Sequence, residues 1–108
     1  MKFNDYQQLA RKTAIYPEHV GLEYTVLGLA SEAGEVAGKL KKILRDKAGL
    51  LSFDDVVDIG SELGDVLWYV AMVADELGLS LLAIAERNIS KLADRQERKV
   101  LGGSGDER

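Results

Sequence analysis

Glu32-Ala-Gly-Glu35 and Glu62-Leu-Gly-Asp65 are two short acidic motifs with the same spacing, and they dominate the interpretation of this chain. In each motif the two acids are three positions apart, so on an α-helix they lie on one face, about one turn from each other. Two such helices side by side would bring four carboxylates together. At an effective dielectric constant near 20, two like charges about 5 Å apart repel by roughly 3 kcal/mol. The motifs therefore predict two neighbouring helices whose four acids bind a divalent cation, Mg²⁺ or its substitute Mn²⁺.

A pair of acids at this spacing is more often a solvated helix face than a pair of metal ligands. Two matching pairs, each flanked by core positions, favour the metal site. A glycine also lies inside each motif, at Gly34 and Gly64, although glycine costs about 1 kcal/mol of helix propensity relative to alanine. We expect these glycines to allow a close approach of helices or of a ligand.

Apolar residues that recur every three or four positions predict four helices. Asn4 with Gln7, and Ser52 with Asp55, have the spacing of capping boxes that begin the first and third helices. Ser80 is the expected N-cap of the fourth helix. The predicted helices span residues 5–15, 20–46, 53–77 and 81–99.

The 108 residues are enough for one domain, which we expect to span residues 1–101 and to be followed by a flexible glycine-rich tail at residues 102–108. From Val66 to Ala74 the third helix is apolar on every side, and such a segment is hard to bury inside one small subunit. We therefore expect a homo-oligomer packed through this segment. The expected fold is all-α, a four-helix bundle completed by homo-oligomerisation.

The composition excludes several classes of protein. With no cysteine and one histidine, the chain cannot form disulfides, thiolate metal sites or a histidine-rich zinc site. Its net charge of -4 disfavours broad binding to a nucleic-acid backbone. It has no apolar run long enough to span a bilayer, and residues 1–6 lack a signal-peptide core. We expect a cytoplasmic protein with neither nucleic acid nor membrane as a partner.

The predicted fourth helix has a polar group on its apolar face. Asn88 lies close to the centre of that face, and Lys91 and Arg95 follow three and seven positions later on the same side. An amide, an ammonium and a guanidinium together suit phosphate oxygens, since Arg95 can bind them in bidentate fashion. The alternative is that Lys91 and Arg95 form ion pairs with acids of a neighbouring helix.

Three further residues are candidates for contacts with a substrate. Lys39 lies one turn beyond Glu35, so an ion pair between the two is the simpler interpretation and a phosphate contact is the alternative. Trp68 could stack on a base, although its place in the apolar run favours a core or interface role. Tyr69 shares the acidic face of its helix, and we expect its ring to form a pocket wall.

Over nearly its whole length, the chain resembles the MazG-like nucleotide pyrophosphohydrolases of the all-α NTP pyrophosphatase superfamily. The resemblance rests on the two acidic motifs, on Asn88-Ile-Ser-Lys91 with Arg95, and on the glycine-rich ending. It implies that the four acids bind Mg²⁺ and that the protein hydrolyses (deoxy)nucleoside triphosphates to the monophosphate and pyrophosphate. It also implies a homodimer or homotetramer of helical bundles.

The sequence departs from this family pattern just before the first motif. Many relatives have a further acid there, where this chain has Ser31. The identity of the general base is therefore open. One candidate is a metal-held hydroxide oriented by Glu32 or Glu35, which are the expected catalytic residues.

The residues and the resemblance lead to the same expected reaction, in which water attacks the α-phosphorus and pyrophosphate leaves. Lys91 and Arg95 would steady the phosphates, and Asn88 would bind the metal–phosphate assembly or the sugar. Two alternatives stand beside this expectation. One is phosphoribosyl-ATP pyrophosphohydrolase, whose acidic helices are similar. The other is a non-catalytic helical oligomerisation module, in which the acids pair with lysines and arginines of a partner. The preferred base and sugar stay open.

Overall fold

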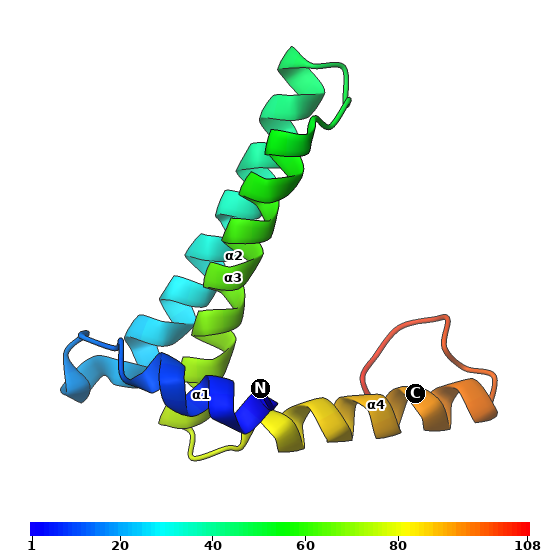
Figure 1. Cartoon of the computed structure of the whole chain (residues 1–108). Helices are drawn as coiled ribbons and strands as arrows, with labels where there is room; N and C mark the ends of the chain where they lie inside the picture. Colours follow the sequence, from blue (N-terminus) through cyan, green and yellow to red (C-terminus); the bar gives the residue numbers. More distant parts are fainter.

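The computed structural model describes residues 1–108 and contains helices and no strands. Two long helices form an antiparallel hairpin, a short first helix crosses the base of that hairpin, and the last helix leaves it (Figure 1). The all-α class and the four predicted helices are confirmed. In chain order, the elements are α1 (Phe3–Arg11), the 3₁₀ turn η1 (Glu18–Val20), α2 (Gly21–Asp46), α3 (Phe53–Glu76) and α4 (Leu81–Glu97).

The beginning of α1 differs from the prediction. The helix starts at Phe3 with Lys2 as its N-cap residue, and the Lys2 N–H donates to the Asp5 carboxylate at 2.9 Å. The predicted cap residues Asn4 and Gln7 instead bind the start of α4. Local spacing assigned them to their own helix, whereas their partners lie more than 70 positions away in the chain.

Two other predicted caps are present. Ser52 and Asp55 form the capping box of α3, with the Asp55 N–H donating to Ser52 Oγ at 3.1 Å and the Ser52 N–H donating to the Asp55 carboxylate at 3.0 Å. Ser80 accepts from the Ala83 N–H at the start of α4. At the other end α4 stops at Glu97, two residues before the predicted end, because Lys99 has left-handed backbone with φ of 61°.

The core lies where α1 crosses the hairpin. Ala71 and Met72 of α3 are fully buried there, and Ala10 and Leu81 pack beside them. The apolar segment of α3 that was expected to need a second subunit is thus largely covered by the chain's own helices. Large apolar side chains are exposed elsewhere, on the hairpin and on α4: Leu40, Leu44, Val56, Val57, Leu63, Ile89 and Leu92.

Within one chain the four helices do not close into a bundle. The chain bends by 103° between α3 and α4, and α4 does not contact α2. The bend begins with Gly78, whose φ is 70°, and the Leu79 N–H donates to the Ala74 carbonyl in the way that ends many helices at glycine. No single helix is both long and apolar enough to cross a membrane. The residues after α4 fold back towards it (Figure 1).

Candidate active site

The hairpin brings three of the four predicted acids together. Glu32 of α2 and Glu62 and Asp65 of α3 each place a carboxylate oxygen within 4.8 Å of the other two. Glu32 and Glu62 lie on the facing sides of the two helices and are partly buried, whereas Asp65 is at the exposed edge. The grouping follows from the helical period, because residues three or four positions apart lie on the same face of a helix, and these faces of α2 and α3 meet in the hairpin.

Glu35 is outside this group. It lies about 60° around α2 from Glu32, and its side chain is exposed. It makes no ion pair or side-chain hydrogen bond. Three of the four acids of the two motifs therefore meet, and the fourth, Glu35, lies on the solvent-exposed side of α2.

The acids repel one another. The pKa of Glu32 is raised above its usual value by desolvation and by the charges of Asp65, Glu62 and Glu35. A divalent cation would remove this repulsion. Oxygen ligands at about 2.1 Å from one Mg²⁺ ion are at most about 4.2 Å apart, so small side-chain movements of the three acids would suffice to hold it. The donor set, made only of carboxylate oxygens, fits a hard cation.

Lys39 does not form the ion pair with Glu35 that the spacing suggested. Its Nζ lies 3.7 Å from Oε1 of Glu62, across the hairpin. Both side chains are only partly exposed. An ammonium therefore stands at the edge of the acid cluster and offsets part of its negative charge.

An open pocket of about 330 Å³ adjoins the acids. Glu32 and Asp65 line it together with Thr13, Trp68 and Tyr69. The Trp68 Nε1 donates to Thr13 Oγ1 at 2.8 Å, and its ring meets that of Tyr69 edge-on at 4.9 Å. Trp68 also packs against the core, in agreement with the expected core role, and its stacking on a base stays a prediction.

Trp68 and Tyr69 form an aromatic wall of this pocket. Tyr16 and Tyr24, which the sequence analysis did not single out, extend it. Tyr24 stacks on Tyr16 at 5.1 Å between centroids, and its ring lies 6.4 Å from that of Tyr69. Burial, the neighbouring Tyr24, and the charges of Glu32 and Asp65 raise the pKa of the Tyr69 hydroxyl. The Tyr69 phenol thus stays neutral beside the acids at physiological pH.

The glycine that permits a close approach is not in either acidic motif. A Cβ at Gly28 would lie 2.1 Å from Cε1 of Tyr69, whereas a Cβ at Gly34 or Gly64 would meet nothing within 4 Å. No other helix of the chain therefore approaches Gly34 or Gly64 closely, and the approach of a ligand at these glycines stays a prediction. Gly28 stands one turn before Glu32 on the same helix face, and that spacing was the available signal.

A network of ion pairs and hydrogen bonds holds Tyr16, one of the residues of the aromatic wall, in place. The Arg11 guanidinium contacts Asp75 at 2.5 Å and Glu76 at 3.2 Å, and the Tyr16 hydroxyl donates to Glu76 at 2.5 Å. The hydrogen bond from Tyr16 and then the Arg11 charge hold the pKa of Glu76 below its usual value. These contacts join the connection after α1 to the end of α3, and so fix Tyr16 beside Tyr24.

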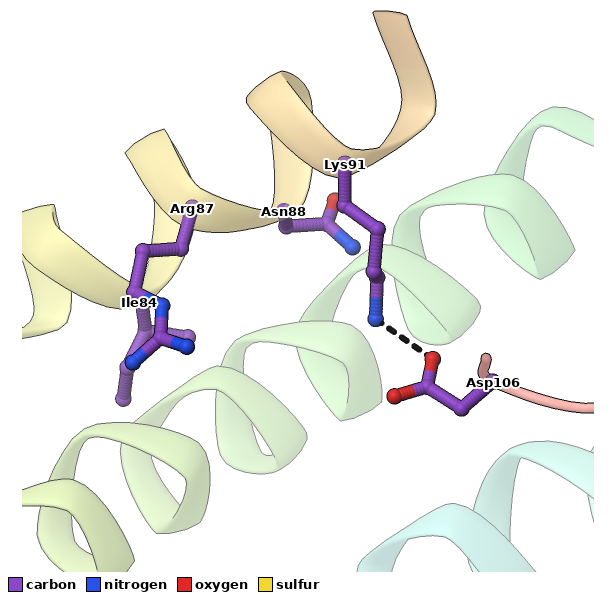
Figure 2. Close-up of a pocket in the computed structure, with 5 residues that line it drawn as sticks. All are labelled: Ile84, Arg87, Asn88, Lys91 and Asp106. Atoms are coloured by element: carbon purple, nitrogen blue, oxygen red, sulfur yellow. Dashed lines mark hydrogen bonds and ion pairs between the residues drawn. The ribbon is translucent and has the colours of Figure 1, made fainter. Parts of the chain in front are cut away.

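The predicted phosphate-binding residues lie on α4, in a different part of the chain. Asn88 and Lys91 line an open pocket of about 550 Å³ with Ile84, Arg87 and Asp106, and none of the four acids lines it. Figure 2 shows Lys91 pointing towards Asp106, with Asn88 beside it. Asn88 is exposed.

The ion-pair alternative for Lys91 and Arg95 is met in part. Lys91 Nζ lies 2.7 Å from Oδ1 of Asp106. Arg95, a residue that is only 5% exposed, contacts both the carboxylate and the carbonyl of Asp106 through its guanidinium. The partner comes from the C-terminal segment, and not from a neighbouring helix as that alternative had it. Arg87, one turn before Lys91, is a further cation that the sequence analysis did not include.

Comparison with known proteins agrees with this geometry. A family model described as the MazG nucleotide pyrophosphohydrolase domain matches residues 21–100, from the first residue of α2 to beyond the end of α4. The chain is 46% identical over 114 aligned positions to the Gene 37 protein of Mycobacterium phage L5, and the match covers 100% of each chain. No solved structure matches. Since the family model includes both acidic motifs and most of the chain, this protein belongs to the MazG nucleotide pyrophosphohydrolase family.

Proposed function

We propose that this protein hydrolyses (deoxy)nucleoside triphosphates to the monophosphate and pyrophosphate in a Mg²⁺-dependent reaction at the α-phosphorus. The observation that supports it most is the meeting of Glu32, Glu62 and Asp65 beside an aromatic-lined pocket. Family membership favours the same class of reaction. An acidic protein binds an acidic nucleotide here because a divalent cation reverses the local charge.

Each acid has a role in this proposal. Glu32, Glu62 and Asp65 would hold Mg²⁺, which neutralises phosphate charge and makes a bound water more acidic. Glu35, exposed and without an ion pair, would accept the proton of the attacking water. The new bond joins the water oxygen to the α-phosphorus, and the bond from that phosphorus to the bridging oxygen breaks as pyrophosphate leaves.

The aromatic side chains of the pocket offer a surface on which the base of the nucleotide would stack. Trp68 and Tyr69 line the pocket beside Glu32 and Asp65, and Tyr24 lies next to Tyr69. Stacking on aromatic rings is worth roughly 1–3 kcal/mol per base and tolerates different bases. Lys39, which contacts Glu62 weakly at 3.7 Å, could move to a phosphate oxygen when the substrate binds.

The separation of the two sets of site residues supports a homodimer or homotetramer. The acids lie on the hairpin, whereas Asn88, Lys91 and Arg95 lie on a helix that bends away from it by 103°. A second copy that lays its α4 over the hairpin would bring cations to the acids. It would also cover exposed apolar residues on both elements, including Leu63 of the hairpin and Ile89 of α4.

The test is release of pyrophosphate from a panel of canonical and modified (d)NTPs, with Mg²⁺, with Mn²⁺ and with EDTA. We expect release only with metal, and a loss of at least about 100-fold in kcat for Glu35→Gln and for Asp65→Asn. The matched control is Glu23→Gln, an exposed acid of the same helix α2 that makes no ion pair. Near-normal turnover by the two variants would refute the assignment of their acids.

The panel should include phosphoribosyl-ATP. Its selective hydrolysis would identify the protein as the related pyrophosphohydrolase. No release from any substrate, together with a melting temperature that Mg²⁺ leaves unchanged, would favour the oligomerisation module. In that module the acids would pair with lysines and arginines of a partner, as Glu62 pairs with Lys39 within the chain.

A further inference from the structure

The C-terminal segment, residues 98–108, folds into a compact loop against α4. The Arg108 guanidinium holds this loop together by donating to four backbone carbonyls, and the Arg98 guanidinium binds the Arg108 carbonyl at 2.6 Å. Gly103 and Gly105 adopt left-handed backbone, with φ of 85° and 89°, which lets the loop turn back. The carbonyls that accept from Arg108 belong to Val100, Leu101, Gly102 and Gly105.

This loop delivers one carboxylate to the cations of α4. Oδ1 of Asp106 lies 2.7 Å from Lys91 Nζ and 3.1 Å from Arg95 Nη2. The other acid of the loop, Glu107, is exposed and makes no ion pair. Lys91 and then Arg95 hold the pKa of Asp106 below its usual value, so this carboxylate is ionised at neutral pH.

The same pocket has capacity for a larger anion. Arg87 lines it and makes no ion pair, and the amide of Asn88 lies between Arg87 and Lys91 in the sequence. The one carboxylate that reaches these cations contacts Lys91 and Arg95 and leaves Arg87 without an acidic partner. A chain of phosphates offers more negative charge and more acceptor oxygens than Asp106 does, and a guanidinium can bind them in bidentate fashion.

We propose that the Asp106 carboxylate competes with phosphate groups for Lys91 and Arg95 of α4. The C-terminal segment thereby limits phosphate binding to α4 until a di- or triphosphate chain displaces Asp106. This inference rests on the proposed function for the assignment of Lys91 and Arg95 to phosphates. The Asp106 side chain is 77% exposed and that of Lys91 is 40% exposed. The exposed ion pair between Asp106 and Lys91 is weak, so an incoming phosphate chain can break it, whereas the Arg95 side chain of the second pair is only 6% exposed.

The test is calorimetric titration of inorganic pyrophosphate, without metal, into the wild type, Asp106→Asn and Glu107→Gln. We expect Asp106→Asn to bind pyrophosphate roughly 3- to 10-fold more tightly than the wild type, because removal of the competing charge frees Lys91 and leaves Arg95 without an anionic partner, although Arg95 keeps its contact with the backbone carbonyl of residue 106. Glu107→Gln makes the same change in net charge without touching the cations, and should bind as the wild type does. Equal or weaker binding by Asp106→Asn would overturn the proposal.

The double variant Asp106→Asn/Lys91→Ala identifies where the gain arises. We expect it to lose the tighter binding, whereas a retained gain would show that Asp106 acts elsewhere and would also overturn the proposal. Since the titration involves neither metal nor turnover, its result is independent of the proposed reaction. Hydrolysis by the wild type with no gain in Asp106→Asn would remove only the competitor. A gain without any hydrolysis would remove only the proposed reaction.

Discussion

Glu32 is the residue on which the position and the charge of the acid cluster both depend. It is the member of the cluster that α2 supplies, and it faces two carboxylates of α3. Its pKa is raised by desolvation and by Asp65, Glu62 and Glu35. A carboxyl whose pKa is higher in the folded than in the unfolded protein costs stability once the pH exceeds its ordinary value, which is 4.5 here. The cost grows until the pH passes the folded-state pKa.

This sign leads to a pH-dependent effect of Glu32→Gln on the metal-free protein. In EDTA we expect the variant to melt at a higher temperature than the wild type at pH 7, and at the same temperature below about pH 4, where both side chains are uncharged. Mg²⁺ at pH 7 should raise the melting temperature of the wild type and leave that of the variant nearly unchanged. Thermal unfolding of both proteins and of Glu23→Gln across this range is the measurement. A pH profile shared by the wild type and Glu32→Gln would contradict the prediction.

At the scale of residues, the sequence predicted the acid cluster because motif spacing on a helix is a local property. An i, i+3 pair stays on one face wherever the helix lies. Which of the four acids converge depends on how the two helices are rotated about their axes, and Glu35 falls outside for that reason. The spacing of Gly28 from Glu32 places it on the acidic face of α2, but its close contact is with the ring of Tyr69 from another helix, which that spacing does not specify.

At the scale of elements, α1 acts as a clamp on the joint between α3 and α4. The Gln7 amide donates to the Leu79 carbonyl at 2.9 Å and accepts from the Leu81 N–H at 3.0 Å. Asn4 accepts from the Ser80 hydroxyl and from the Leu82 N–H. The first helix thereby caps the fourth. Capping rules search within a few residues of a helix start, which is why the sequence pointed to the wrong helix for both side chains.

Because the buried Gln7 amide binds two backbone groups between α3 and α4, its removal is expected to lower the free energy of unfolding. Gln7 is 7% exposed, so Gln7→Leu leaves a backbone carbonyl and an N–H of the joint without partners. We expect a loss of about 1–3 kcal/mol in the free energy of unfolding, measured by urea denaturation. Gln8→Leu, at an exposed neighbouring position without side-chain hydrogen bonds, is the control and should change stability by less than about 0.5 kcal/mol. Equal denaturation midpoints for the two variants would show that the amide contacts contribute nothing.

At the scale of the whole molecule, the direction of α4 separates what was predictable from what was not. The predicted limits at residues 77 and 81 lie within one residue of the observed end of α3 at Glu76 and match the start of α4 at Leu81. The bend of 103° between them depends on the backbone at Gly78 and on the side chains of α1. A helical period specifies a face and not a direction in space. The bundle completed by a second copy thus stays a prediction, and exposed apolar residues on α4 such as Ile89 and Leu92 are what it would cover.

A composite site can be tested by complementation between two inactive variants. Glu62→Gln removes an acid of the hairpin and Lys91→Ala removes a cation of α4, so we expect each variant alone to lose most of its activity. If each site takes its acids from one chain and its cations from another, a mixed dimer has one intact site of its two. Random pairing would then restore roughly a quarter of wild-type activity to a co-refolded equal mixture. A mixture of Glu62→Gln with Asp65→Asn, which both damage the hairpin, should restore none, because every site in its mixed dimers lacks one acid. Recovery in neither mixture would place the acids and the cations of each working site on the same chain, and would require α4 to move towards its own hairpin.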